Sequence, residues 1–313
     1  MKFTKTAIAV AIVGIAAAPM MVSADTTLSG ILEIQVQGSD ADDVPLTAAP
    51  EGDMEVAVGD VLFNIASNHE TNSGLTAYSN MRADFNSRSN EGAAQADSVY
   101  IGIKGGFGDF RIGETPLAVE YGQVAGDLFD AGSEINGGLS YTGTFGPVGI
   151  TANFSPENNQ EVVGLGGKFA VGGFGIGIGF ESRGNGGVDG DAAATPAVPT
   201  ISSETFTTTA FGVTYSLAGA SLAATFWTRE TAGPDDMENF SVKVGYGIGG
   251  VSGALTFATQ EMGAGIDREK VRLDVAYGLG GGMAVSTRIT AATDSVVPAN
   301  DNTAWRIQLN KAF

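Results

Sequence analysis

The last nine residues of the chain, Trp305-Arg306-Ile307-Gln308-Leu309-Asn310-Lys311-Ala312-Phe313, alternate between apolar and polar side chains. Successive side chains of a strand point to opposite faces. One face of this stretch is therefore apolar, with an aromatic residue near each end, and the other face is polar. The pattern is typical of a barrel wall in a membrane, whose apolar face meets lipid and whose polar face meets a lumen.

The N-terminal residues have the features of a secretory signal peptide. Lys2 and Lys5 precede an apolar run from Ala7 to Val22. Val22-Ser23-Ala24 then forms a small-residue cleavage site. The pattern predicts that residues 1–24 are removed and that residues 25–313 form one domain. The alternative is an uncleaved anchor helix, which is less favoured because the apolar run is short and ends in the cleavage pattern.

Composition excludes several classes of protein. Without Lys2 and Lys5 the chain has 14 basic and 35 acidic residues, a formal charge of −21. Nucleic-acid binders are basic, so we expect no nucleic-acid partner. Cysteine is absent, which argues against a small disulfide scaffold in an exported protein. The acidity is compatible either with simple solubility or with a negative potential that attracts cations to a pore mouth.

The rest of the chain repeats one unit, in which two alternating segments flank a short glycine-rich turn and a longer polar connection follows. Antiparallel strands joined by tight turns at one end and long loops at the other are typical of outer-membrane barrels. The alternation predicts sixteen strands: Thr26–Gln37, Asp53–Ala66, Leu75–Asn86, Asp97–Lys104, Asp109–Glu114, Asn136–Gly143, Val148–Ser155, Glu161–Ala170, Phe174–Glu181, Thr205–Tyr215, Ala220–Arg229, Asn239–Tyr246, Val251–Gln260, Glu269–Tyr277, Gly282–Ala292 and Asn302–Phe313.

These segments predict an all-β protein, a sixteen-stranded antiparallel transmembrane barrel. Val271, Leu273 and Val275 alternate with charged residues, and Phe174 and Ile176 begin a segment that alternates with glycine. A soluble β-sandwich with one solvated face is the alternative. It is less favoured because the apolar face recurs around all the strands and no separate core-filling set is visible. The last strand then has to pair with Thr26–Gln37, which removes the sheet's edges.

Several stretches resemble the general-diffusion porins of Gram-negative outer membranes. Thr26–Gly30 is similar to the opening strand of these porins, and Ser98–Gly105 with Phe107–Gly113 is similar to their fourth and fifth strands. Phe313 matches the family's C-terminal aromatic residue. The resemblance covers essentially residues 25–313. It implies a homotrimer in outer-membrane lipid, a third loop folded into each pore, and a C-terminal strand that is the assembly signal for the barrel-assembly machinery.

The third loop of such a barrel corresponds here to Thr115–Ile135, which we call loop three. Its carboxylates are expected at the pore constriction, where they would face basic residues of the wall. Strand alternation places the basic candidates on the polar face, although it gives no depth in the pore. The acidic candidates are Glu114, Glu120, Asp127, Asp130 and Glu134, and the basic candidates are Arg82, Lys104, Arg111, Arg272, Arg288 and Arg306.

The resemblance predicts a water-filled channel for passive diffusion of ions and small hydrophilic solutes. Family members often have an arginine just after the third loop, where this chain has Glu134-Ile135-Asn136. Together with the net charge, this departure predicts a preference for cations, because a pore of one charge selects the opposite ion. The alternatives are a channel specific for a sugar or another solute, and a non-conducting, adhesin-like barrel. Inward aromatics such as Tyr78 and Tyr100 are too few to indicate a sugar pathway.

Nothing in the sequence indicates an enzyme, a cofactor or a metal site. A serine hydrolase needs a base beside the serine. The single histidine, His69, falls in the turn predicted at Asn68–Gly74 and is expected there as an exposed residue, away from any lipid-facing strand. One histidine and no cysteine make zinc or haem sites improbable. The acidic stretch Asp40–Asp43 has no recognised calcium-loop spacing.

Overall fold

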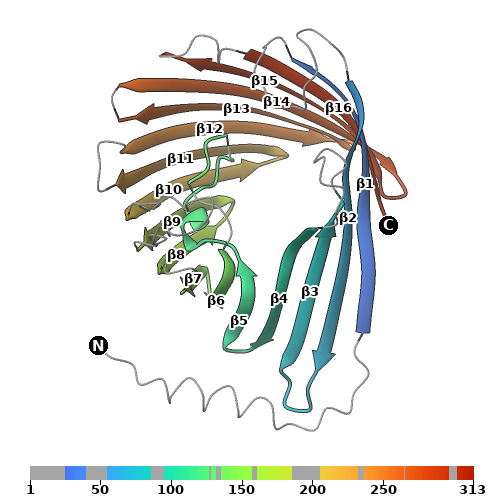
Figure 1. Ribbon diagram of the computed structural model, residues 1–313, viewed down its shortest axis with the longest axis vertical. Coiled ribbons are helices and arrows are strands. Elements are labelled where there is room, and N and C mark those ends of the chain that lie inside the picture. The colour runs from blue at the N-terminus through green and yellow to red at the C-terminus, as the bar shows by residue number, and fades with distance from the viewer. Residues whose placement is uncertain are drawn as a thin grey trace, which may run out of the picture.

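The computed structural model describes residues 25–39, 55–85, 95–126, 128–131, 135–156, 161–184, 205–231, 236–263, 265–295 and 302–313. These residues form a closed barrel of sixteen antiparallel strands (Figure 1), which confirms the predicted fold. The strands are β1 Asp25–Ser39, β2 Glu55–Glu70, β3 Thr76–Asp84, β4 Gln95–Gly105, β5 Gly108–Thr115, β6 Ile135–Phe145, β7 Val148–Ser155, β8 Val162–Val171, β9 Phe174–Arg183, β10 Phe206–Leu217, β11 Ala220–Thr231, β12 Met237–Ile248, β13 Val251–Met262, β14 Ile266–Gly280, β15 Met283–Asp294 and β16 Asn302–Ala312.

Each strand pairs with its neighbours in the chain, and the seam between β1 and β16 completes the ring. The seam runs from the pair Ile31 and Ala312 to the pair Ser39 and Ala304. The predicted pairing of the last strand with the first is therefore confirmed. Because every strand has two neighbours, no row of backbone N–H and C=O groups is left for pairing with another chain.

Two glycines fit the aromatic side chains at the ends of the seam. The backbone of Gly30 exchanges hydrogen bonds with that of Phe313 at 3.1 and 3.2 Å. A Cβ built on Gly30 would be 2.5 Å from the ring of Phe313, and one built on Gly38 would be 2.9 Å from the ring of Trp305. These two contacts require a residue without a side chain, since real Cβ atoms essentially never come so close. Phe63 packs edge-on against Phe313 with 5.7 Å between the ring centroids.

The wall has an apolar outer face and a polar inner face. On β9, Phe174, Ile178 and Phe180 are exposed on the outside, whereas Glu181 on the inside is buried. On β16, Ile307 is exposed and Gln308 is buried. Exposed apolar side chains around a closed sheet are what a lipid environment accommodates. No helix among the described residues is long and apolar enough to cross a membrane.

Most strands extend beyond their predicted ends. The strand predicted at Glu269–Tyr277 covers Ile266–Gly280, and the strand predicted at Asn239–Tyr246 covers Met237–Ile248. In both cases the strand pairing continues through residues that the sequence pattern assigned to a turn or a loop. The same extension corrects the prediction for His69. It lies in β2, paired with Ala77 of β3 and on the same face as Phe63 and Ile65, and its side chain is half-buried.

Loop three folds into the barrel, as predicted. It leaves β5 at Thr115 and returns at the start of β6, and it includes a short 3-10 helix, η1, at Ala118–Tyr121. Figure 1 shows this segment inside the ring of strands, beside β8 to β11. Its position divides the lumen into a wall that it covers and a wall that it faces.

Candidate functional site: the lumen and loop three

Glycines on the inner face of β8, β9 and β10 receive the backbone of loop three. A Cβ built on Gly166 would be 2.5 Å from the carbonyl oxygen of Ala118. Cβ atoms built on Gly177 and Gly179 would overlap the carbonyl oxygens of Tyr121 and Val119. The loop therefore lies closer to the wall than any side chain would allow. This explains why the segment after Phe174 alternates its large residues with glycine rather than with polar side chains.

Polar side chains of the wall hold the loop by its backbone. Asn153 of β7 accepts a hydrogen bond from the N–H of Ala118 at 2.8 Å. Three successive inward residues of β11 also contact the loop. The hydroxyl of Thr225 accepts hydrogen bonds from the N–H groups of Val124 and Ala125, each at 2.9 Å, and Trp227 and Arg229 donate to the loop. The acceptors are the carbonyl oxygens of Phe129, at 3.0 Å, and Ala131, at 2.8 Å. Lys270 of β14 donates to the carbonyl oxygen of Leu128 at 3.0 Å.

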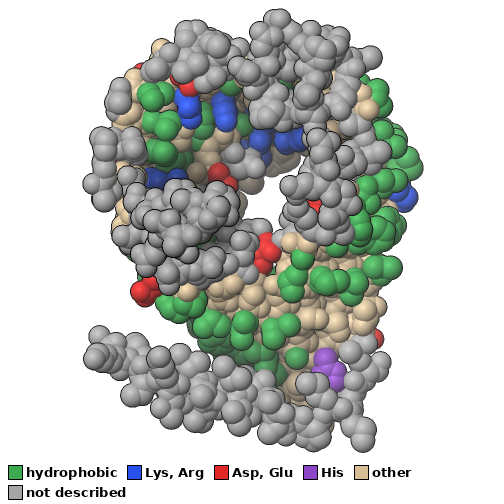
Figure 2. Space-filling view, in the orientation of Figure 1, with side chains coloured by type: hydrophobic (Ala, Val, Ile, Leu, Met, Phe, Trp, Pro, Cys, Tyr) green, Lys and Arg blue, Asp and Glu red, His purple; other side chains and the backbone are tan. Residues whose placement is uncertain are grey.

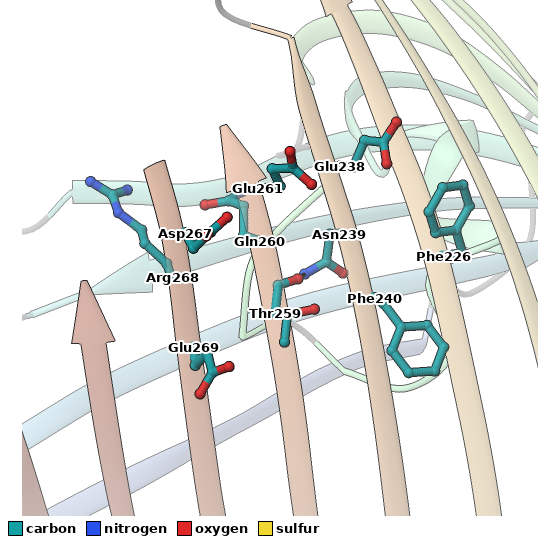
Figure 3. Close-up of a pocket in the computed structure, with 10 residues that line it drawn as sticks. All are labelled: Phe226, Glu238, Asn239, Phe240, Thr259, Gln260, Glu261, Asp267, Arg268 and Glu269. Carbon is teal, nitrogen blue, oxygen red and sulfur yellow. Dashed lines mark hydrogen bonds between the residues drawn. The ribbon is translucent and has the colours of Figure 1, made fainter. Parts of the chain in front are cut away.

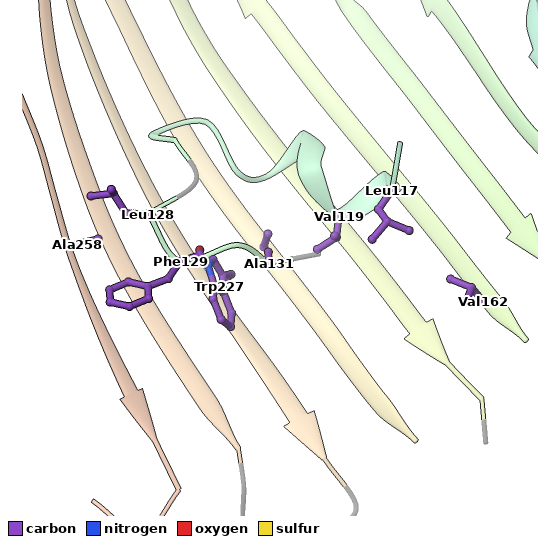
Figure 4. Packing of buried hydrophobic residues seen from close by; sticks show 9 residues of the cluster. Leu117, Val119, Leu128, Phe129, Ala131, Val162, Trp227 and Ala258 are labelled. Atoms are coloured by element: carbon purple, nitrogen blue, oxygen red, sulfur yellow. Dashed lines mark hydrogen bonds between the residues drawn. The ribbon is translucent and has the colours of Figure 1, made fainter. Parts of the chain in front are cut away.

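A small apolar cluster buries the underside of loop three (Figure 4). The indole of Trp227 is 1 % exposed and lies beneath Phe129 and Ala131. Loop three shields this indole, which lies on the otherwise polar inner face of β11, from the water of the lumen. The cluster contains Leu117, Val119, Leu128, Phe129 and Ala131 from the loop and Val162, Ala210, Trp227 and Ala258 from the wall.

Charged groups of the wall extend this attachment. The carboxylate of Glu181 is fully buried, and Nε of Arg183 donates to it at 2.7 Å. Asp130 of the loop is close enough to interact electrostatically with both Glu181 and Arg229. The predicted acidic residue Asp130 thus lies beside the wall that holds the loop, and it has an interaction of its own.

Beside the covered wall, β14 to β16 have a row of basic side chains, and β14 also contacts the loop through Lys270. Asp274 bridges two of them, at 2.9 Å from Nε of Arg272 and 2.6 Å from Nε of Arg288. Arg306 of β16 is the direct cross-strand partner of Arg288. Arg268 pairs with Asp294 at 3.0 Å. Figure 2 shows basic side chains along the inner surface and an open passage through the molecule beside them.

The predicted basic residues all occupy the inner face, at different heights. Arg272 lies next to loop three, because a Cβ on Gly126 would be 3.6 Å from its Nη2. Arg111 stacks on Tyr100, with 4.1 Å from the guanidinium carbon to the ring centroid. Arg82 lies near the long-loop end of β3 and Lys104 near the short turn between β4 and β5. Lys104 and the start of loop three therefore lie at opposite ends of the barrel wall.

The predicted acidic residues of loop three are only partly described. Asp127 and Glu134 lie outside the described residues. Glu120 is half-buried in η1. Glu114 is near the end of β5, where the register shifts between Gly113 and Thr115, so strand alternation does not carry through it. Glu114 and Glu120 each have an interaction in the structure.

Sequence reasoning missed the residues that hold the loop. These residues lie on strands that are distant from loop three in the sequence, and the tertiary fold brings them next to the loop: Thr225, Trp227, Arg229 and Lys270. A signal for Trp227 was present, since it falls on the inner face between Thr225 and Arg229.

In total twelve basic residues line the lumen in the described part of the chain: Arg82, Lys104, Arg111, Lys168, Arg183, Arg229, Lys243, Arg268, Lys270, Arg272, Arg288 and Arg306.

Part of the negative charge lies outside the lumen. At the long-loop end of β12 to β14, a hollow of about 310 Å³ on the wall is lined by Phe240, Thr259 and several carboxylates (Figure 3). Glu238, Glu261 and Asp267 are direct cross-strand partners on the outer face. Adjacent like charges repel. Net charge is therefore a poor guide to the charge that a solute meets inside the pore. The described residues contain no group of His, Asp and Glu able to hold a metal ion.

Comparison with known proteins agrees with this architecture. The model of a family described as Gram-negative porin matches residues 6–305. The fold is similar to an anion-selective porin from Comamonas acidovorans, with a TM-score of 0.75 at 14% identity over 93% of this chain and 100% of that one. It is also similar to the trimer form of OmpT, an outer membrane protein of Vibrio cholerae, with a TM-score of 0.71 at 16% identity over 93% and 100% of the two chains. A search of curated proteins found no match.

Proposed function

Because the chain belongs to the family of Gram-negative porins, we propose that it forms a water-filled channel for passive diffusion of ions and small hydrophilic solutes. The family and the fold mean that it lies in the outer membrane, where barrels of this kind turn their short hairpins to the periplasm. The observation that carries the proposal is the closed wall with an apolar outside and a charged, polar inside, in which loop three covers one side only.

Single-channel recording in a planar lipid bilayer tests the channel directly. Purified protein is expected to insert with stepwise increases in current that are the same at both polarities of a small voltage. A correctly folded, heat-resistant barrel that gives no current steps would overturn the proposal and favour the adhesin-like alternative. Saturation of the current by one sugar would instead favour the substrate-specific alternative.

We propose a homotrimer as the working assembly. The structurally similar OmpT of Vibrio cholerae is described in a trimer form, and the family resemblance supports the same state here. Outer-membrane lipid is then the partner of the remaining apolar wall. Cross-linking of membranes, followed by electrophoresis without boiling, is expected to give a band of three chains. A single-chain band from membranes that give current steps would refute the trimer.

The sign of ion preference is a finer proposal. We propose a preference for cations that comes from the loops rather than the wall, since the described wall is rich in basic residues. Carboxylates at the mouths raise the local concentration of cations. Reversal potentials in a salt gradient measure this preference. Neutralising loop three by Asp127→Asn with Asp130→Asn is expected to lower it, and a clearly anion-selective wild-type channel would refute it.

We also propose that the C-terminal strand is the signal read by the barrel-assembly machinery. Its last residue, Phe313, packs on Gly30 and Phe63, so the same side chain would serve recognition first and closure afterwards. Replacing Phe313 by Ala is expected to lower the amount of folded barrel in membranes. A Gly30→Ala variant separates the two roles, because it disturbs closure and leaves the C-terminal strand unchanged.

A further inference from the structure

A second site lies in the lumen, at the short-turn end of β3 to β6. It is a cavity of about 440 Å³, lined by Thr76, Lys104, Asp109, Thr142 and Thr144 and by glycines of the turns. Loop three leaves β5 from the other end of that strand. The cavity is therefore separate from the part of the lumen where loop three contacts the wall, and a solute would meet it at the periplasmic mouth.

The barrel's register brings one cation and one anion to this cavity. Lys104 and Asp109 are direct cross-strand partners across the turn between β4 and β5. Thr76 is the partner of Lys104 on one side, and Thr142 is the partner of Asp109 on the other. Ordinary alternation thus places two opposite charges and two hydroxyls in one row on the inner face.

The two charged groups are held apart. The hydroxyl of Tyr78 donates to Oδ1 of Asp109 at 2.5 Å, and the ammonium of Lys104 lies 5.4 Å from the centroid of the same tyrosine ring. No ion pair joins Lys104 to Asp109 in the part of the chain that the structure describes. Tyr78 therefore orients the carboxylate and stands beside the ammonium, while Arg111, hydrogen-bonded to Tyr78, is a second cation near Asp109. Lys104 and Asp109 both line the cavity, where a third molecule can reach them.

Glycines of the turns line the open side of the cavity. A Cβ built on Gly106 or on Gly74 would meet no atom within 4 Å. Cavities of a few hundred cubic ångströms accept small organic molecules. Charge-assisted hydrogen bonds are the strong ones, and a pocket with one of each sign suits a molecule with both charges.

The geometry points to a subsite for zwitterionic solutes, the α-amino acids and their analogues. The solute's carboxylate binds the ammonium of Lys104, its ammonium binds the carboxylate of Asp109, and the threonine hydroxyls accept or donate the remaining hydrogen bonds. A molecule with only one charge leaves one of the two protein groups without its partner. This inference rests on the proposed channel, since the solute has to reach the cavity through the lumen or the periplasmic mouth.

Three solutes of similar size test the charge requirement. L-Alanine has both charges, propionate lacks the ammonium and ethylamine lacks the carboxylate. Each is added to one compartment of a bilayer and then to the other, at the same concentration, while the current through single channels is recorded. L-Alanine is expected to reduce the current saturably from one side, and the other two are expected to bind about tenfold more weakly, the loss of one charged hydrogen bond.

Variants of the chain locate the effect. Lys104→Met and Asp109→Asn are each expected to weaken the L-alanine response about tenfold. The exchange Lys104→Asp with Asp109→Lys keeps both charges in the row and is expected to restore part of the response. Lys168→Met is the matched control: Lys168 also faces the lumen near a short turn, but its direct partners are Gly149 and Gly177. The response of the Lys168→Met channel to L-alanine is expected to equal that of the wild type.

The outcomes separate the subsite from the channel. No current at all would refute the proposed channel. Normal current with equal responses to the three solutes, or with unchanged L-alanine binding in Lys104→Met and Asp109→Asn, would refute the subsite and leave the channel standing.

Discussion

The two sides of the lumen are built from different residues for different purposes. On β8 to β10 the inner face has glycines, and loop three lies on it at a distance that no side chain would permit. On β14 to β16 the inner face has arginines bridged by Asp274, and the passage lies beside them. The covered wall therefore sets where the loop stands, and the open wall sets what a passing ion meets. Glycines that make room for the loop therefore shape this pore as much as the charged side chains do.

The largest effect is expected from filling one glycine of the covered wall. Gly177→Ala places a methyl group on the carbonyl oxygen of Tyr121. The loop has to shift toward the open wall, which costs about 1–3 kcal/mol of stability and narrows the passage. Thermal unfolding and single-channel current measure the two consequences.

Gly167→Ala is the matched control for this change. Gly167 is on β8, but its Cβ would be 3.7 Å from the nearest atom, an ordinary contact with Ile178 on the outer side. If both variants unfold and conduct alike, loop three does not rest on these glycines.

A smaller effect on the current, with a similar loss of stability, is expected from loosening the attachment without filling space. Arg229→Gln removes the hydrogen bond to the carbonyl oxygen of Ala131 and a cation beside the buried Glu181. Hydrogen bonds to charged groups contribute about 1.5–3 kcal/mol. Faster hydrogen exchange in residues 128–131 and noisier open-channel current are the expected results.

Lys243→Met serves as the control for Arg229→Gln, because it removes one inward-facing positive charge from β12. Equal exchange rates in the two variants would mean that Arg229 is not a tether. The comparison thereby distinguishes basic residues that hold the loop from those that only line the wall.

The smallest effect on stability is expected on the open wall. Arg288→Gln breaks an ion pair with Asp274 whose side chains are 37% and 29% exposed. Such pairs contribute about 0–1 kcal/mol. The unfolding temperature should therefore hardly change, whereas the reversal potential should move toward greater cation preference. A large loss of stability with no change in selectivity would place Arg288 among the structural residues instead.

The sequence was sufficient for the barrel but not for the attachment of its loop. Alternation of large apolar residues with polar ones predicts the strands, their faces and the closing pair of β1 with β16, because each strand pattern is local. The full extent of Ile266–Gly280 was missed, because Gly278 and Gly280 are typical turn residues, although the strand pairing continues through them.

Contacts between distant strands explain the rest. Thr225 is one hundred residues from Ala125, and no local pattern predicts that its hydroxyl holds the loop. The predicted cation preference rested on the net charge and on one missing arginine after loop three. Arg183, Arg229, Arg268 and Lys270, which were not among the predicted basic residues, add positive charge to the wall. Asp127 and Glu134 remain predictions, outside the described residues.

One measurement tests most directly whether loop three rests on the glycine wall. The chain has no cysteine, so a pair introduced by Ala118→Cys and Gly164→Cys can form only one intramolecular disulfide. A Cβ on Gly164 would be 3.0 Å from that of Ala118, somewhat closer than the roughly 3.8 Å typical of a disulfide, and it would overlap Oδ1 of Asn153, so the pair is introduced together with Asn153→Ala. The pair should cross-link completely in the folded barrel, and its single-channel current should be the same before and after reduction. A pair that stays reduced, or a current that rises sharply on reduction, would contradict the position of the loop.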